Sequence, residues 1–124
     1  MDLDLKDKKG LIGFSYAWNG LKIMAKERNF RIHLLATLIV IIAGLYFKLN
    51  PIEWTAIIFV IGIVLISETF NSVIEQMIDY IKPDIHPTAK IIKDMSAGSV
   101  LLASIIAIIV GMIIFLPKIV HIFS

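Results

Sequence analysis

Three stretches of this 124-residue chain are apolar and long enough to cross a lipid bilayer: residues 30–47, 51–70 and 95–116. A membrane-spanning helix needs about 20 mainly apolar residues. Only 18% of the residues are charged, whereas an ordinary soluble domain has about 25%, and no segment is left over that could build a separate aqueous core. In lipid, backbone N–H and C=O groups must form their hydrogen bonds within the segment, which favours helices. We therefore predict one all-α integral membrane domain over residues 1–124.

The distribution of basic residues predicts how the chain is oriented. All lysines and arginines except Lys48 and Lys118 lie before or at the start of the first stretch, or in the loop at 80–94. By the positive-inside rule, the N-terminus and this loop are cytoplasmic, and the C-terminus is outside. The charged opening MDLDLKDKKG lacks the apolar core of a secretory signal, so we expect no cleavage there. The chain contains no cysteine, which excludes disulfides and thiolate catalysis.

Residues 11–27 have the pattern of an amphipathic helix. Apolar residues recur at spacings of three and four, and polar residues fill the opposite face. This segment is too polar to cross the membrane. We expect it to lie in the cytoplasmic interface, with Tyr16 and Trp18 near the headgroups.

Local signals set the expected ends of the spans. Asn50, Pro51 and Glu53 form an N-cap, a proline in the first turn and a capping-box acid, so the first two spans should make a tight antiparallel hairpin. The second helix can continue to Pro83. A third helix should begin near Pro87 and continue to Pro117.

Small residues repeat every four positions along the third span, at Ser99, Ala103, Ala107 and Gly111. Such a stripe lets helix backbones approach closely in lipid. Two interpretations remain open: the stripe packs against another span of the same chain, or it helps an oligomer to assemble.

The end of the second span carries a continuous polar face, formed by Glu68, Asn71, Ser72, Glu75 and Asp79. Their spacing places them along one side of a helix. For Asp79, a helix end that emerges into water is as good an explanation as a functional site. It explains Glu68 less well, because this residue lies about 25 Å along the helix from Pro51, at the boundary of a hydrocarbon core about 30 Å thick, where charge is costly.

Other charged residues gather at the same level: Glu27 precedes the first span, and Lys93 and Asp94 precede the third. Lys93 and Arg31 can be ordinary snorkelling residues with acidic partners. The alternative is a site for an anionic, metal-bound ligand, in which carboxylates hold Mg²⁺ and a lysine meets phosphate.

Residue chemistry favours phosphoryl transfer at this site. The backbones of Glu68 and Glu75 are separated by about 10.5 Å along a helix axis, which suits two carboxylates that flank a transferring group. One can hold the metal while the other accepts a proton from a lipid hydroxyl. The motifs of soluble nucleotide-binding enzymes and of zinc sites are absent. We expect His33 and His121 to be interfacial anchors, and His86 to be either a nucleotide contact or a solvated loop residue.

Four segments make the chain resemble the prokaryotic diacylglycerol kinase family: SYAWNGL (15–21), ERNFRIH (27–33), ETFNSVIEQMID (68–79) and AKIIKDMSAG (89–98). The resemblance implies a surface helix and three spans in a homotrimer, with active sites shared between protomers. It also implies a bacterial plasma-membrane enzyme that uses ATP and Mg²⁺ to phosphorylate a lipid alcohol, and no nucleic-acid partner.

The resemblance also implies roles for single residues. Glu68 is the expected catalytic base, and Glu27 and Glu75 the expected metal ligands. The remaining expected contacts are, for the nucleotide, Tyr16, Asn71, Asp79, His86, Lys93 and Asp94, and for the lipid, Trp18, Phe30, Arg31, Glu68 and Ala97. Lys9 and Asp84 are matched too loosely to be assigned a role.

The segment ERNFRIH and the proline after His86 are more similar to the Gram-positive branch, whose members resemble undecaprenol kinases. We therefore expect undecaprenol as the acceptor, with diacylglycerol as the alternative. A small proton-coupled multidrug transporter also uses a membrane glutamate, but there the acid should be isolated near mid-membrane. A purely structural membrane subunit is a third alternative, in which Glu68→Gln has no effect.

Overall fold

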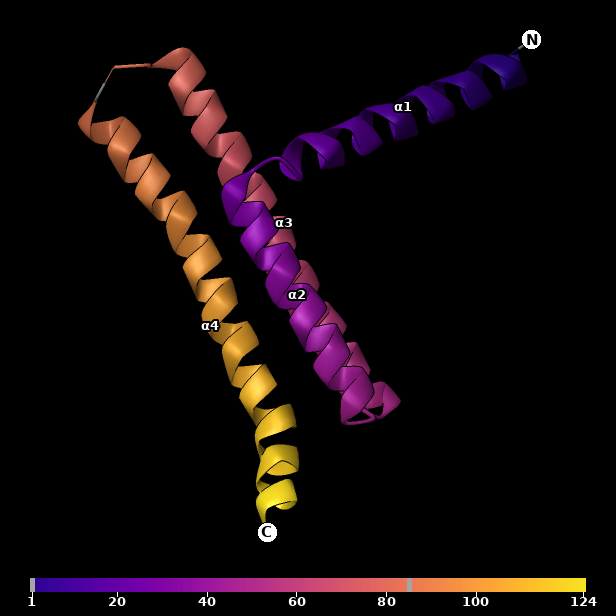
Figure 1. Ribbon diagram of the computed structural model, residues 1–124. Coiled ribbons are helices and arrows are strands. Elements are labelled where there is room, and N and C mark those ends of the chain that lie inside the picture. Colours follow the sequence, from indigo (N-terminus) through magenta and orange to yellow (C-terminus); the bar gives the residue numbers. More distant parts are fainter. Residues whose placement is uncertain (1, 85) are drawn as a thin grey trace.

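The computed structural model describes residues 2–84 and 86–124, with side chains from residue 10 onward, and consists of four helices in this part of the chain. They are α1 (Asp2–Met24), α2 (Arg28–Tyr46), α3 (Pro51–Ile81) and α4 (Pro87–Phe123). α2, α3 and α4 run alongside one another, and α1 projects away from them at the start of α2 (Figure 1). The all-helical prediction is confirmed.

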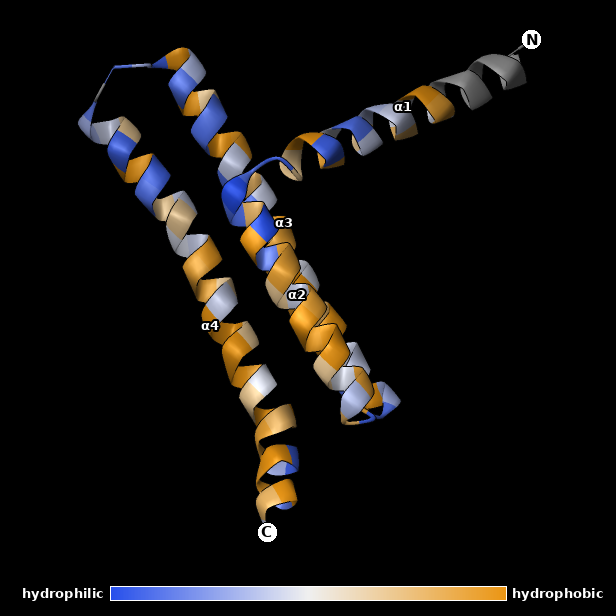
Figure 2. Ribbon diagram, in the orientation of Figure 1, coloured by the Kyte–Doolittle hydropathy of each residue, from blue (hydrophilic) through white to orange (hydrophobic). Residues whose placement is uncertain are grey.

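The three bundled helices are each long and apolar enough to cross a membrane. Figure 2 shows the apolar residues along their middle portions, and hydrophilic residues gathered where α3 ends and α4 begins. Large apolar side chains such as Ile58, Phe59 and Leu101 are exposed. A soluble monomer rarely exposes apolar patches of this extent, so these faces fit a multi-pass membrane protein whose solvent is lipid.

The turn between α2 and α3 confirms the predicted hairpin. The Asn50 side chain accepts a hydrogen bond from the Glu53 backbone N–H at 2.9 Å, and the Glu53 carboxylate accepts one from the Asn50 N–H at 3.0 Å. Lys48 has a φ of 55°, in the left-handed region. This reversal lets the Leu49 N–H donate to the Gly44 carbonyl, which closes the end of α2.

The buried core lies near this hairpin. Leu49, Ile57 and Ile114 form its centre, and the rings of Phe47 and Phe115 meet edge to face with centroids 6.0 Å apart. The end of α4 therefore packs against the α2–α3 turn.

The prediction that the third helix stops at Pro117 is wrong, because α4 continues through Pro117 to Phe123. Proline removes one backbone hydrogen bond and crowds the preceding turn, but membrane helices tolerate it where neighbouring helices support the backbone. Here the next residue, Lys118, forms an ion pair with Glu53 at 3.1 Å. This pair fixes the continued helix to the start of α3.

The first helix also differs from its expected bounds of 11–27. It begins at Asp2 and ends at Met24, and a short turn follows in which the Glu27 N–H donates to the Met24 carbonyl at 2.9 Å. Leu11, Phe14 and Trp18 are exposed, so little of α1 packs against the bundle. The side chain of Lys9 lies outside the described residues.

The small-residue stripe is only partly used within the chain. Ala103 is buried, whereas Ser99 is exposed. A Cβ added to Gly111 meets nothing within 4 Å. Contact within the chain is therefore close at Ala103 and absent at the Gly111 Cα, and Ser99 is left on the surface.

Candidate functional site

The polar face of α3 is buried within the bundle at its first residues. Glu68, Asn71 and Ser72 are 3%, 5% and 4% exposed, respectively. Glu75 is half-buried and Asp79 is exposed. The predicted shared face therefore exists, and it changes from buried to exposed within three helical turns. Burying a carboxylate is costly unless partners compensate, so the neighbours of Glu68 matter.

Glu68 faces a pocket of about 360 Å³ between α2, α3 and α4. We call it the glutamate pocket; its lining includes Asn29, His33, Glu68, Asn71, Glu75, Ala97 and Ser104. His33 of α2 lines the same pocket, and its Nε2 lies 3.7 Å from Oε2 of Glu68. The carboxylate of Glu75 lines the same pocket. Three of the predicted site residues from α3 thus share one pocket with Ala97 of α4.

Asn71 joins Glu75 to the same pocket. Its Nδ2 donates to Glu75 Oε1 at 3.3 Å, and its Oδ1 is buried without a hydrogen-bond partner. A buried polar atom left unpaired costs roughly 1–3 kcal/mol, so this oxygen is suited to accept a donor or a cation from a ligand.

The donor set fits a magnesium ion that arrives with a nucleotide. Mg²⁺ keeps several waters and is bound by one or two carboxylates together with substrate phosphates. Within the described residues no group of three or more His, Cys, Asp or Glu side chains is placed to hold a metal by itself. Glu75 and Asn71 offer two oxygen donors, and Glu27, which is the N-cap of α2, makes no side-chain capping bond.

A second pocket, of about 230 Å³, lies between the end of α3 and the start of α4. We call it the loop pocket; its lining includes Asp79, Asp84, His86, Lys90, Lys93 and Asp94. Lys93 forms an ion pair with Asp79, and Lys90 forms one with Asp94 at 2.6 Å. Four of the six predicted nucleotide contacts therefore meet here, and the other two, Asn71 and Tyr16, lie elsewhere.

His86 has a local structural role in this loop. It is the N-cap of α4, and its Nδ1 accepts a hydrogen bond from the Thr88 N–H at 3.1 Å. Its ring still borders the loop pocket, so capping does not remove it from reach of a ligand.

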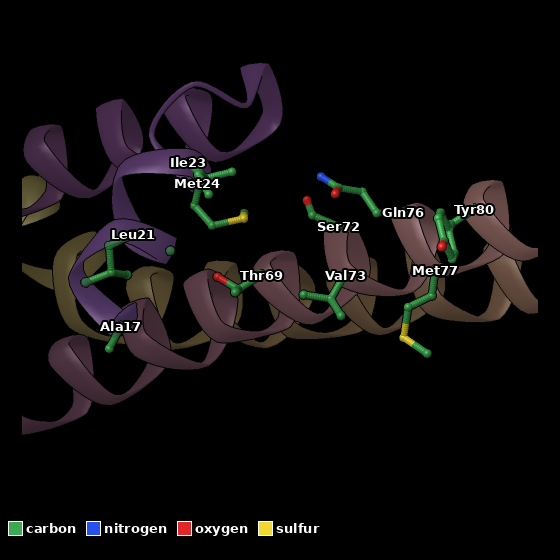
Figure 3. A pocket seen from close by; sticks show the side chains of 11 residues that line it. Ala17, Leu21, Ile23, Met24, Thr69, Ser72, Val73, Gln76, Met77 and Tyr80 are labelled. Atoms are coloured by element: carbon green, nitrogen blue, oxygen red, sulfur yellow. The ribbon is translucent and has the colours of Figure 1, made fainter. Parts of the chain in front are cut away.

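The aromatic residues of α1 lie apart from both pockets. Tyr16 and Trp18 are 73% and 54% exposed. A larger pocket of about 590 Å³, the α1 pocket, lies between α1 and α3 and is lined by other residues, among them Leu21, Met24, Val73 and Met77 (Figure 3). Of the other expected lipid contacts, Phe30 is buried and Arg31 is exposed. Neither lines the pockets described above.

His33 is the residue that the sequence analysis misplaced. It was expected to be an interfacial anchor, but its side chain is only 23% exposed and faces Glu68. The signal in the sequence was a histidine less than two helical turns after Glu27, inside a mainly apolar span. Ser104 was missed as well, because it looks like one more small residue of the third span.

Comparisons with known proteins identify the family of this chain. A family model described as "Prokaryotic diacylglycerol kinase" matches residues 15–115. The undecaprenol kinase of Bacillus subtilis is 38% identical over 94% of this chain and 99% of its own length. A diacylglycerol kinase of Synechocystis is 39% identical over 86% of this chain, which spans 62% of that enzyme. The diacylglycerol kinase of Escherichia coli K12 is 32% identical over 76% of this chain and 78% of its own.

Proposed function

Because this chain belongs to the prokaryotic diacylglycerol kinase family, we propose that it transfers the γ-phosphoryl group of ATP to undecaprenol and forms undecaprenyl phosphate. The chain is a multi-pass membrane lipid kinase, and membership of a kinase family implies that it uses ATP. The observation that carries the proposal is the buried carboxylate of Glu68, which faces a pocket at the polar end of apolar helices. The similarity to the Bacillus undecaprenol kinase over nearly the whole of both chains favours that acceptor.

Glu68 is the proposed base. It takes the proton of the lipid hydroxyl as the hydroxyl oxygen bonds to the γ-phosphorus, and the bond from that phosphorus to the β–γ bridging oxygen breaks. ADP leaves, and the proton remains on Glu68 until it passes to water. The low exposure of Glu68 keeps competing water away from the reacting phosphorus.

Glu75 and Glu27 are the proposed ligands of the Mg²⁺ that accompanies ATP, with Asn71 beside them. When bound, the ion would neutralise part of the negative charge of the ATP phosphates. Lys93, Asp79 and Asp94 are proposed to contact the nucleotide, with His86 and Tyr16 at its edge. Lys93 is already paired with Asp79. When the nucleotide binds, a phosphate therefore replaces Asp79 as the anionic partner of Lys93.

We further propose that the enzyme is a homotrimer in the bacterial plasma membrane. The N-terminus and the 80–94 loop are then cytoplasmic, and residues 11–27 lie along the cytoplasmic interface. Trp18, Phe30, Arg31 and Ala97 border the lipid in this arrangement. The exposed apolar faces of α2 and α4 leave ample surface for protomer contacts and for lipid.

The test is transfer of labelled phosphate from ATP to undecaprenol and to diacylglycerol in parallel, by the purified protein in lipid. We expect faster transfer to undecaprenol. We also expect Glu68→Gln to lower turnover by about 10²- to 10⁴-fold, the usual contribution of general base catalysis, with nucleotide binding retained. Glu53→Gln, the same change at the far end of α3, is the control and should keep its turnover. Preferential transfer to diacylglycerol would show that diacylglycerol is the acceptor. Full activity of Glu68→Gln would show that Glu68 is not the base.

A further inference from the structure

A histidine lies against the buried carboxylate to which the chemistry has been assigned. His33 Nε2 is 3.7 Å from Glu68 Oε2, and the two side chains are 23% and 4% exposed. Asn71 and Glu75 line the same pocket, and the Asn71 amide already donates to Glu75. His33 is therefore a neighbour on another helix that offers Glu68 an N–H donor.

The separation is longer than a direct hydrogen bond, which joins nitrogen and oxygen at about 2.7–3.2 Å. Catalytic hydrogen bonds are often long before substrate binds and shorten in the reacting complex. Both side chains project from helices that the hairpin holds together, so a small side-chain rotation closes the gap without movement of the backbone.

His33 also lies where two pockets meet. It lines the glutamate pocket and, in addition, an apolar groove of about 360 Å³ between α2, α3 and α4, whose other walls include Val40, Val64, Ala107 and Ile108. Ser104 is likewise shared by both. A lipid alcohol whose chain follows this groove brings its hydroxyl past His33 to Glu68.

We propose that His33 is a positioning residue for the kinase reaction: its imidazole N–H donates to the Glu68 carboxylate and holds the free carboxylate oxygen toward the hydroxyl of the lipid alcohol. This inference rests on the proposed function, because it requires Glu68 to be the base. A residue in this role affects turnover far more than nucleotide binding, since it touches neither ATP nor its metal.

The test compares His33→Leu, which removes the donor at similar volume, with His33→Gln, which keeps an N–H donor. We expect kcat of His33→Leu to fall about 10- to 100-fold, the cost of misplacing a reacting group by on the order of 1 Å, with KM for ATP unchanged. His33→Gln should recover most of the loss. His121→Leu, at the exposed end of α4, is the matched control and should keep wild-type kinetics.

Three results overturn the inference: wild-type kcat in His33→Leu, a loss that appears equally in KM for ATP, or a His33→Gln variant no more active than His33→Leu. Circular dichroism and ATP binding establish that each variant is folded. Failure of the proposed function is recognised separately, because the wild-type protein then phosphorylates neither undecaprenol nor diacylglycerol.

Discussion

The acids of α3 differ in burial along the helix, and this difference predicts which reactant each of them meets. Glu68 is buried and lines the glutamate pocket, Glu75 is half-buried and bonded to Asn71, and Asp79 is exposed and paired with Lys93. A lipid hydroxyl arrives from the apolar side and a nucleotide from water. The order of the three acids therefore matches the order of lipid, metal and nucleotide.

Replacing Glu75 by Gln should weaken the use of magnesium. We expect the Mg²⁺ concentration for half-maximal rate to rise about 10- to 100-fold, the usual cost of disturbing a metal site, because one of few carboxylate ligands is lost. The rate measured against Mg²⁺ at saturating ATP and lipid checks this. Glu53→Gln serves as the control, and an unchanged Mg²⁺ dependence in Glu75→Gln contradicts the assignment.

Replacing Lys93 by Met should weaken ATP binding. An ammonium that meets phosphate contributes roughly 1.5–3 kcal/mol as a charged hydrogen bond, so we expect KM for ATP to rise at least tenfold while KM for the lipid stays constant. Lys48→Met, in the turn at the opposite end of the bundle, is the charge-matched control. Equal KM values for ATP in the two variants contradict the proposed contact.

At the scale of elements, α3 packs tightly against α2 at Gly44. A Cβ added to Gly44 lies 2.6 Å from Cη2 of Trp54, whereas one added to Gly62 of α3 meets nothing within 4 Å. Trp54 also packs against the core cluster, so its ring has little room to move away.

We therefore expect Gly44→Ala to destabilise the hairpin by about 1–3 kcal/mol, the usual cost of overpacking. Gly62→Ala should be neutral or stabilising, because alanine favours a helix by roughly 1 kcal/mol over glycine. Thermal unfolding of both variants in the same detergent measures the difference. A lower melting temperature for Gly62→Ala than for Gly44→Ala contradicts the close approach.

Most of these elements could be predicted from the sequence, because their signals are local. Apolar length defined the spans, and Asn50 with Glu53 defined the hairpin end. The continuation of α4 past Pro117 could not be predicted, since it involves the ion pair between Lys118 and Glu53, which are far apart in the chain. The same reason applies to the site: spacing on one helix placed Glu68, Asn71 and Glu75 together, but it could not show that His33 of another helix faces Glu68.

At the scale of the whole molecule, residues that must act in the same reaction lie far apart within one chain. Asp79, the partner of Lys93, follows Glu68 by eleven residues, which is about 16 Å along α3. Lys93 lines the loop pocket, whereas Glu68 lines the glutamate pocket. This separation favours a composite site, in which Lys93 of a neighbouring protomer approaches the phosphates held near Glu68.

A composite site predicts that two impaired variants, assayed at an ATP concentration well below the KM of Lys93→Met, restore each other when they assemble together. Closed oligomers repeat the same interface between protomers, so a random mixture of Glu68→Gln and Lys93→Met subunits should contain about one quarter intact sites. We expect the mixture, unfolded and refolded together in lipid, to recover activity toward that fraction of wild type. The same variants refolded separately and then combined are the control and should show no more activity than the average of the two variants alone. Absence of recovery in the co-refolded sample would show that Glu68 and Lys93 of a single chain serve the same site, because every site would then contain one of the two substitutions.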